Sequence, residues 1–249
     1  MPKNNDLVIV TPAWNCENSI RQTCMSVIAQ SYDNWRMIVV DDVSSDATSQ
    51  KVADLSNNLG LGEKISILRR EEKYGEVRNT YDIVHDQCNK NDIVVRLDGG
   101  DWITDNDCFY ILNEIYKNPT YDPAVLWTAH RWEYNTNQNI SNNLDSSMDV
   151  YTHPWVSSHL KTFRKSSMDG INKKNYFDEN GSWIMIACDQ AIFLPMLEKS
   201  RREKKNLVYL PMCMYHYSID LLREDLFTCD RSQQQKFSAE RIRKRGFIE

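Results

Sequence analysis

The chain has 249 residues, a formal net charge of −5 and 41% hydrophobic residues. This length allows one large domain or two small ones, each with a substantial core. The composition is ordinary for a soluble globular protein, and the negative charge argues against a protein whose main task is to bind a polyanion. The first residues are polar and no apolar run approaches about 18 residues, so we expect neither a signal peptide nor a transmembrane helix.

The seven cysteines are an odd number and include no C-x-x-C pair. Such a set is typical of reduced thiols and not of a disulfide framework or a zinc site. Together with the absence of a targeting segment, it predicts a cytoplasmic protein.

The first half of the chain alternates between apolar strand-like runs and amphipathic helical segments. Short runs rich in β-branched residues predict four strands, at 7–15, 35–42, 64–70 and 92–97. Apolar residues at helical spacing predict helices between them, at 18–30, at about 46–57, and along a segment carrying Val77, Tyr81, Val84 and Cys88 on one face. This order favours an α/β fold with a doubly wound, mostly parallel sheet.

The second half predicts a helix at 105–117, a strand at 124–132 and a loop at 135–147 near the entry of an acceptor. An apolar strand-like run then precedes a helix opened by Asp189. We expect one domain over 1–249, with a nucleotide-sugar-binding half at 1–104, an acceptor half at 105–225 and a C-terminal tail at 226–249.

The segment RLDGGD places Asp98 and Asp101 at the carboxyl end of the strand at 92–97. Ligands of open α/β sheets bind at such strand ends, and carboxylates are hard ligands suited to Mg²⁺ or Mn²⁺. Gly99 and Gly100 would let a phosphate or a sugar approach the backbone closely. The alternative is that these aspartates are only turn residues.

Further motifs accompany this acidic segment in a fixed order. They are Pro12-Ala-Trp14-Asn15, Ser26-Val-Ile-Ala-Gln30, Asp41-Asp42-Val-Ser44-Ser-Asp46-Ala-Thr48, Gly75-Glu-Val-Arg78-Asn79 and Asp98-Gly-Gly-Asp101. In their order and spacing they resemble the inverting family 2 glycosyltransferases of GT-A fold. The resemblance is close over residues 7 to 110 and looser to about residue 217. It implies transfer of a sugar from a nucleoside diphosphate, with UDP the expected nucleotide.

The resemblance also implies a donor site. Trp14 would stack on the nucleobase and Asp42 would accept a hydrogen bond from a ring N–H, while Arg78 would reach the diphosphate. The remaining donor-binding positions that it implies are Pro12, Asp98 and Gly100. Each has a structural alternative: Trp14 as a core aromatic, Asp41 and Asp42 as turn or capping residues, and Arg78 as a surface charge.

The acidic motif departs from the D-x-D-D pattern of the family, because Gly100 stands where a third aspartate is usual. The resemblance assigns the metal, Mn²⁺ or Mg²⁺, to Asp101 and the ribose or sugar hydroxyls to Asp98. Loss of a supporting carboxylate predicts weaker metal dependence. His216 is a further metal-ligand candidate, but a lone histidine between tyrosines is more often structural.

Asp189 matches the general-base position of the family, at the head of a helix in the acceptor half. Its structural alternative is a helix N-cap. The segment 153–165 resembles an acceptor loop, in which His159, Arg164 and Lys165 are candidates for contacts with donor phosphates or acceptor.

The sequence therefore predicts an inverting, metal-dependent glycosyltransferase that acts on a hydroxyl acceptor, with a glycan expected. Basic clusters at 201–205 and 241–245 keep a hydroxylated base in nucleic acid open as a second acceptor class. A catalytically silent nucleotide- or glycan-binding module is the non-enzymatic alternative. A nucleotidyltransferase or an NAD-dependent dehydrogenase is disfavoured, because no glycine-rich phosphate loop follows the first strand.

Overall fold

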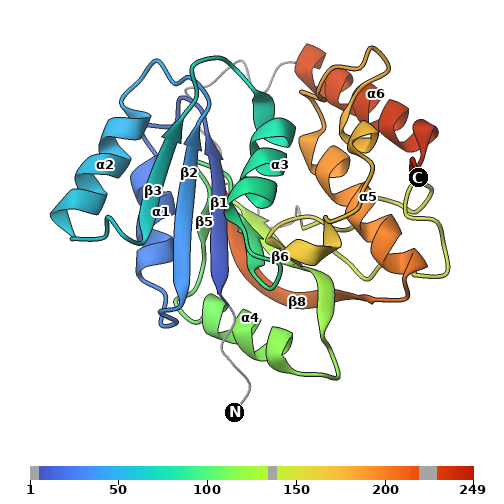
Figure 1. Cartoon of the computed structure of the whole chain (residues 1–249), viewed down its shortest axis with the longest axis horizontal. Helices are drawn as coiled ribbons and strands as arrows, with labels where there is room; N and C mark the ends of the chain where they lie inside the picture. Colours follow the sequence, from blue (N-terminus) through green and yellow to red (C-terminus); the bar gives the residue numbers. More distant parts are fainter. Residues whose placement is uncertain (1–5, 134–138, 219–228) are drawn as a thin grey trace.

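The computed structural model describes residues 6–133, 139–218 and 229–249. Within them one eight-stranded sheet runs through the molecule in the order β3-β2-β1-β4-β7-β6-β8-β5 (Figure 1). The strands and helices of the first half are β1 Leu7–Ala13, α1 Ile20–Ile28, β2 Trp35–Asp41, α2 Thr48–Asn58, β3 Ile65–Arg69, α3 Gly75–Gln87 and β4 Ile93–Arg96. All were predicted, with ends that differ by a few residues.

Strands β1 to β4 pair in parallel, with β1 between β2 and β4. Parallel neighbours must be joined by crossovers, and α1, α2 and α3 are those crossovers. All seven residues of β1 are buried. A strand covered by helices on both faces has to be apolar throughout, which is why it appears in the sequence as a continuous apolar run.

The second half contributes β5 Trp102–Ile103, α4 Cys108–Lys117, β6 Pro123–Trp132, β7 Lys161–Arg164, α5 Cys188–Arg202, β8 Asn206–Tyr217 and α6 Cys229–Arg245, with two 3-10 turns at Lys165–Ser167 and Lys173–Tyr176. Here the sheet becomes mixed. β7 is antiparallel to both β4 and β6, and β8 is parallel to β6 but antiparallel to β5.

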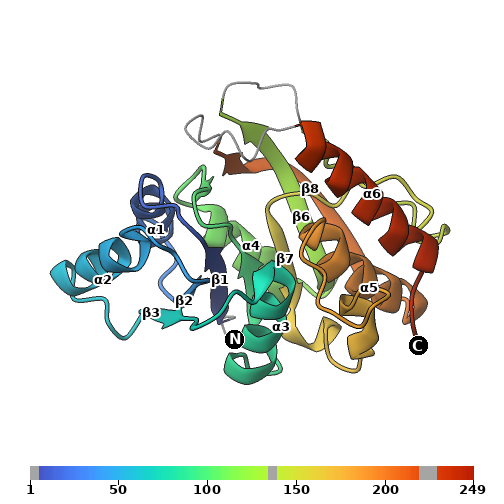
Figure 2. The same ribbon diagram turned by 90° about the horizontal axis from the view of Figure 1, so that it is seen from above.

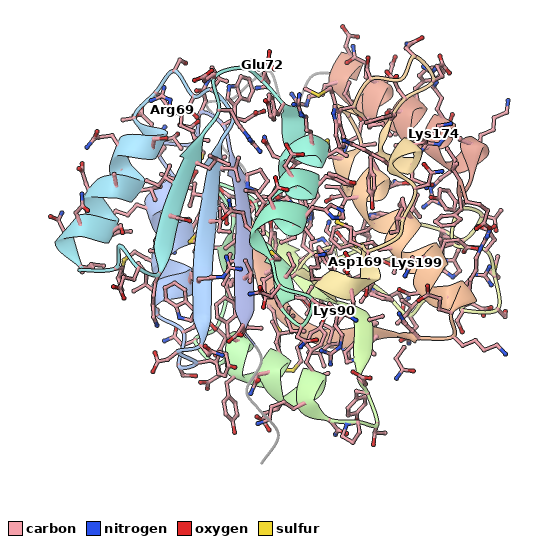
Figure 3. The ribbon with its side chains drawn as sticks, in the orientation of Figure 1. Arg69, Glu72, Lys90, Asp169, Lys174 and Lys199 are labelled. Carbon is pink, nitrogen blue, oxygen red and sulfur yellow. The ribbon has the colours of Figure 1, made fainter. Side chains whose placement is uncertain are left out.

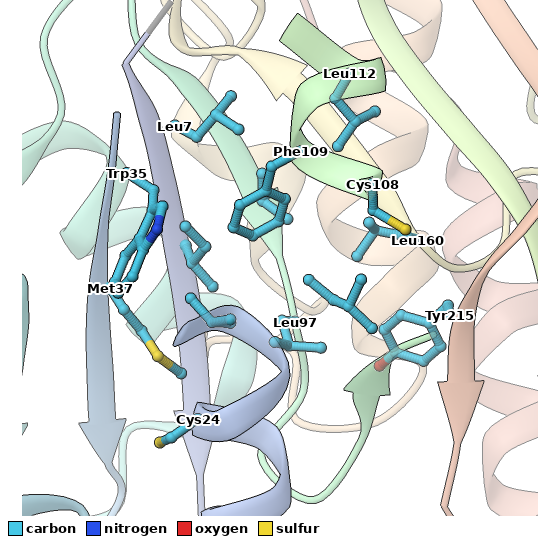
Figure 4. Packing of buried hydrophobic residues seen from close by; sticks show 14 of the residues in the cluster. Leu7, Cys24, Trp35, Met37, Leu97, Cys108, Phe109, Leu112, Leu160 and Tyr215 are labelled. Atoms are coloured by element: carbon cyan, nitrogen blue, oxygen red, sulfur yellow. The ribbon is translucent and has the colours of Figure 1, made fainter. Parts of the chain in front are cut away.

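Two apolar cores lie on opposite faces of the sheet. Alternate residues of β1 divide between them: Leu7 and Ile9 face α1, α2 and α4, whereas Val8 and Val10 face α3 and α5. Figure 4 shows the first core from close by, with Phe109 and Leu112 of α4 beside Leu7. The charged side chains of Arg69, Glu72, Lys90 and Lys174 are exposed at the surface (Figure 3).

Two expectations for the acceptor half were wrong. The apolar run before Asp189 forms no strand beyond one bridge between Phe177 and Trp183, and Met185 and Ile186 within it are exposed. The segment 153–165, expected to be a loop throughout, is irregular from 153 to 160 but continues into β7. Met185 and Ile186 line a cavity, whereas Ile184 of the same run is buried in the second core, a division that periodicity alone cannot reveal.

Part of the predicted loop at 135–147 lies outside the described residues, and its described part from 139 has no helix or strand. None of the helices in the described ranges is both long and apolar enough to cross a membrane. The six cysteines whose side chains are described carry free thiols.

Candidate active site

A cavity of about 610 Å³ opens at the carboxyl ends of β1, β2 and β4. Its size falls within the usual range for small-molecule sites. The first turns of α3 and α5 complete its wall, and so does the start of α6, through Arg231, Gln234 and Gln235. Helix α6 contacts α5 and lies alongside it (Figure 2), so the C-terminal tail of the sequence forms part of the site.

One end of the cavity is lined by Pro12, Trp14 and Asp42. Both carboxylate oxygens of Asp42 accept backbone hydrogen bonds, from Tyr74 N at 2.8 Å and from Gly75 N at 2.9 Å. These bonds fix the carboxylate and leave each oxygen a second lone pair for a ligand. Trp14 is 37% exposed and is therefore not a core aromatic. The Lys73 ammonium lies over the Trp14 ring, 3.1 Å from the ring centroid.

Asp41, next to Asp42, is a turn residue, which was the structural alternative considered for it from the sequence. It is buried, it accepts from Ser44 N at 2.8 Å and from the Ser49 hydroxyl, and it does not line the cavity. Successive residues of an extended chain point to opposite faces, so only one of the two aspartates can reach the site.

Arg78 does not come to the cavity with the other predicted donor-site residues, judged over the described ranges. Its guanidinium lies 3.4 Å from the centroid of the Tyr74 ring and 3.8 Å from Asp82. The helical spacing of α3 explains the difference, because Gly75, Glu76 and Asn79 face the cavity while Arg78 is rotated away from it. Its contact with a diphosphate remains an untested prediction.

Asp98 and Asp101 both line the cavity. Arg96, which is almost fully buried, forms an ion pair with Asp98. Asp101 accepts hydrogen bonds from the Tyr215 hydroxyl at 2.5 Å and from Ser218 N at 2.8 Å. Burial, and then the nearby charge of Asp98, raise the pKa of Asp101 well above its usual value. A cation beside these two carboxylates would relieve that electrostatic cost.

The two carboxylates fit one side of a divalent-cation site. No group of three His, Cys, Asp or Glu side chains suited to a metal exists among the described residues. Further ligands would therefore have to come from phosphate oxygens and water, as is common for Mg²⁺. His216 does not line the cavity; its ring stacks on Trp102 at 4.0 Å and its Nδ1 accepts from Arg131 Nε at 3.0 Å.

The two glycines of the acidic motif are required by the backbone. A side chain at Gly99 would lie 2.9 Å from the backbone of Pro12 and Ala13. Gly100 has φ +113°, and a Cβ there would lie 3.2 Å from Ser19 Oγ. The absence of a third aspartate is thus tied to a conformation that side-chain-bearing residues rarely adopt.

Asp189 lies in the first turn of α5 and faces the cavity, and it makes no capping hydrogen bond. Its Oδ1 accepts from Lys161 Nζ at 2.5 Å, and its Oδ2 lies 3.7 Å from His159 Nε2. Burial raises the pKa of Asp189, but its basic neighbours, with the buried Lys161 ammonium first among them and Arg96 behind it, together outweigh burial and lower that pKa below its usual value. The carboxylate is therefore ionised at physiological pH.

His159 joins the two acidic parts of the site. Its Nδ1 lies 4.0 Å from Asp98 and its ring stacks on Tyr215 at 4.5 Å. Burial, followed by the charge of Lys161, lowers the pKa of His159 to about 3, so the imidazole is neutral. Arg164 and Lys165, the other candidates of this segment, are paired with Asp122 and Asp169 outside the cavity.

Sequence reasoning gave no role to Glu76, Arg96, Lys161 or Tyr215. Glu76 and Arg96 stand inside or beside the recognised motifs, and a charged residue within an apolar strand was a signal for Arg96. Lys161 lies on β7 inside the predicted acceptor segment, and Tyr215 lies on β8 directly before His216, but no pattern singled them out. Alternation along β8 directs Tyr215 and Tyr217 toward His159 and directs His216 away from it.

Curated relatives match short segments of the chain. A beta-1,3-glucosyltransferase of Escherichia coli, WfgD, described as transferring from UDP-Glc to alpha-D-GlcNAc-diphosphoundecaprenol, is 38% identical over 74 residues. That match covers 29% of this chain and 27% of the relative. TuaG of Bacillus subtilis, a putative teichuronic acid biosynthesis glycosyltransferase, is 34% identical over 67 residues, which are 27% of this chain and 25% of TuaG.

Solved glycosyltransferases share the fold over most of the chain. Residues 1–349 of Staphylococcus aureus TarS, in complex with UDP-GlcNAc, align with a TM-score of 0.64 and 16% identity, over 94% of this chain and 65% of that fragment. The mannosyltransferase PcManGT from Pyrobaculum calidifontis, in complex with GDP-Man and Mn²⁺, aligns with a TM-score of 0.63 and 12% identity, over 95% of this chain and 63% of that one.

At such identities these likenesses establish the fold, which is GT-A. The model of the family described as glycosyl transferase family 2 matches residues 8–211, most of the chain. That range contains the strand ends and the carboxylates that line the cavity. The chain therefore belongs to glycosyl transferase family 2.

Proposed function

We propose that the protein is an inverting glycosyltransferase that moves a sugar from a UDP-sugar to a hydroxyl acceptor. The observation that carries this proposal is the meeting in one cavity of Asp42, Asp98, Asp101 and Asp189. These carboxylates come from three separate segments, and a nucleotide-sugar transfer needs acidic groups at the nucleobase, at the diphosphate and at the acceptor hydroxyl.

For the donor, Trp14 offers an aromatic face and Asp42 offers a fixed acceptor for a ring N–H such as that of uracil. TarS has been solved with UDP-GlcNAc and WfgD is named for UDP-Glc, which supports a UDP-sugar. Lys73 lies over the Trp14 ring, so a stacking base would occupy the other face or displace this ammonium.

For the metal, Asp101 would be a direct ligand with Asp98 beside it, and Mn²⁺ or Mg²⁺ would suit their oxygens. Such an ion, when bound, neutralises the charge of a departing diphosphate. The complex of PcManGT with Mn²⁺ supports a divalent ion. Tyr215 and Ser218 orient the Asp101 carboxylate through their hydrogen bonds.

For catalysis, Asp189 would take the proton of the acceptor hydroxyl as its oxygen attacks the anomeric carbon. Attack on the face opposite the leaving diphosphate inverts the configuration of that carbon. Lys161 holds one oxygen of Asp189 and keeps the carboxylate ionised, which leaves the other oxygen for the acceptor.

For the acceptor, we propose a glycan hydroxyl. The names of TuaG and of WcaA, a putative colanic acid biosynthesis glycosyl transferase of Escherichia coli, refer to polysaccharides. The basic clusters give little support to nucleic acid. Arg201 and Arg202 are paired with buried Glu198, and Arg243 and Arg245 donate to backbone carbonyls. These four arginine side chains therefore already have hydrogen-bond partners within the protein.

A thermal-shift screen tests the proposal. UDP should raise the melting temperature more than ADP or CDP does, with a further rise when Mn²⁺ or Mg²⁺ is added, because a ligand that binds only the native state stabilises it. Equal shifts for all nucleotides, or none, would contradict the UDP assignment and leave a glycan-binding module as the alternative.

A further inference from the structure

Glu76 is an acidic residue of the cavity with no part in the assignments above. It stands in the first turn of α3, lines the cavity and keeps 35% of its side chain exposed. Arg96 Nη2 donates to its Oε1 at 2.6 Å. The Glu76 carboxylate is thus held by Arg96 on one side and is open to the cavity on the other.

Arg96 fixes this carboxylate relative to the acidic motif. Only 1% of its side chain is exposed, and its two terminal nitrogens bind Glu76 and Asp98. A buried guanidinium between two carboxylates sets their orientation through charge-assisted hydrogen bonds. Glu76 and Asp98 therefore act as one rigid polar wall.

This wall stands between the two ends of the proposed site. On one side, Gly75, the residue before Glu76, donates its N–H to Asp42 at the nucleobase end. On the other side, Glu76 shares the cavity wall with Cys188, the residue before Asp189, and is close enough to it for the two to interact electrostatically. A donor that reaches from Asp42 to Asp189 would lie along the cavity wall that includes Glu76.

The charge of Glu76 indicates which part of the donor lies there. A carboxylate repels phosphate oxygens, whereas it accepts strong hydrogen bonds from hydroxyl groups. We infer that Glu76 accepts a hydrogen bond from a ring hydroxyl of the transferred sugar and so helps to select the donor. This inference rests on the proposed function, and it adds a sugar-recognising residue to the donor site.

The test separates the sugar from the nucleotide. Dissociation constants for UDP, UDP-glucose, UDP-galactose and UDP-GlcNAc are measured by calorimetry for the wild type, for Glu76→Ala and for Glu72→Ala. Glu72 is an exposed glutamate four residues away (Figure 3) that does not line the cavity, and it serves as the matched control.

For the UDP-sugar that the wild type binds most tightly, Glu76→Ala should weaken binding about tenfold, as expected for one hydrogen bond to a charged group. Its affinity for UDP should stay within about twofold of the wild type, and Glu72→Ala should change neither constant. A loss shared equally by UDP and the UDP-sugar, or no loss for either, would overturn the inference.

Glu76→Gln keeps the volume of the side chain and an oxygen for Arg96, so it decides the matter if Glu76→Ala fails to fold. It should show a loss in the same direction, confined to UDP-sugars, with UDP binding retained. A wild type that binds no UDP would overturn the proposed function itself, and this inference with it.

Discussion

Lys161 Nζ donates to Asp189 Oδ1 at 2.5 Å, from a side chain with no exposed surface. The pair brings together β7 and the start of α5, two elements separated by a long irregular segment. A buried ammonium needs such a partner, and a carboxylate held this way stays ionised. The relationship makes Lys161 a positioning residue for the proposed base, with consequences for the pH dependence of the enzyme.

Replacement of Lys161 by Met should shift the pH profile of transfer. Without the ammonium, burial dominates and raises the pKa of Asp189, so the acidic limb of kcat/KM should move to higher pH than in the wild type. Lys165→Met is the control, because Lys165 pairs with Asp169 away from the cavity. Coincident profiles for wild type and Lys161→Met would show that Lys161 does not set the state of Asp189.

Asp189→Asn should abolish turnover without unfolding the protein. The amide matches the carboxylate in size but cannot take a proton, so transfer, or slow donor hydrolysis, should fall about 10²- to 10⁴-fold. UDP affinity should be retained, and the melting temperature compared with that of the wild type measures any loss of the Lys161 contact. An active but less stable variant would reduce Asp189 to a structural role.

Asp101→Ala should remove the Mn²⁺-dependent part of UDP binding, as measured by calorimetry with and without the ion. His216→Phe should leave this linkage intact, because the ring of His216 stacks on Trp102 outside the cavity. Metal linkage that survives Asp101→Ala, or is lost in His216→Phe, would place the ion elsewhere.

Gly100→Ala should destabilise the protein by about 1–3 kcal/mol, the usual cost of a strained backbone position, because its φ is +113° and Ser19 Oγ crowds the new Cβ. An aspartate at this position should cost at least as much, although the family pattern favours it there. Gly62→Ala is the control, with open space around its Cβ. Denaturant midpoints provide the measurement, and equal midpoints for the two variants would contradict the argument.

Acid should destabilise the protein partly through His159. Its folded-state pKa of about 3 lies below the unfolded value of about 6.5, so the unfolded chain binds an extra proton between these values. The free energy of unfolding contributed by this group therefore falls as the pH falls from about 6.5 toward 3. His159→Phe keeps a ring against Tyr215 and should flatten this slope in denaturant titrations at pH 7 and pH 5. An unchanged slope would assign the acid sensitivity to other groups.

Much of the nucleotide half was predictable from local signals. Buried parallel strands must be apolar throughout, and polar residues must follow where they end, so the runs at 7–15, 35–42 and 92–97 identified both the sheet and the edge that carries the site. The motif residues Trp14, Asp42, Asp98 and Asp101 come together there because those strands are neighbours.

The tertiary structure alone decided the rest. Which of Asp41 and Asp42 enters the cavity, and whether Arg78 does, depends on the rotation of strand ends and of α3 about their axes. The pairing of Asp189 with Lys161 depends on how β7 packs against the start of α5, and the wall of Glu76, Arg96 and Asp98 depends on side chains that meet across α3 and β4. Contacts between distant segments produce no local periodicity in the sequence. The burial of a strand, in contrast, requires an apolar side chain at nearly every one of its positions and is therefore visible in the sequence.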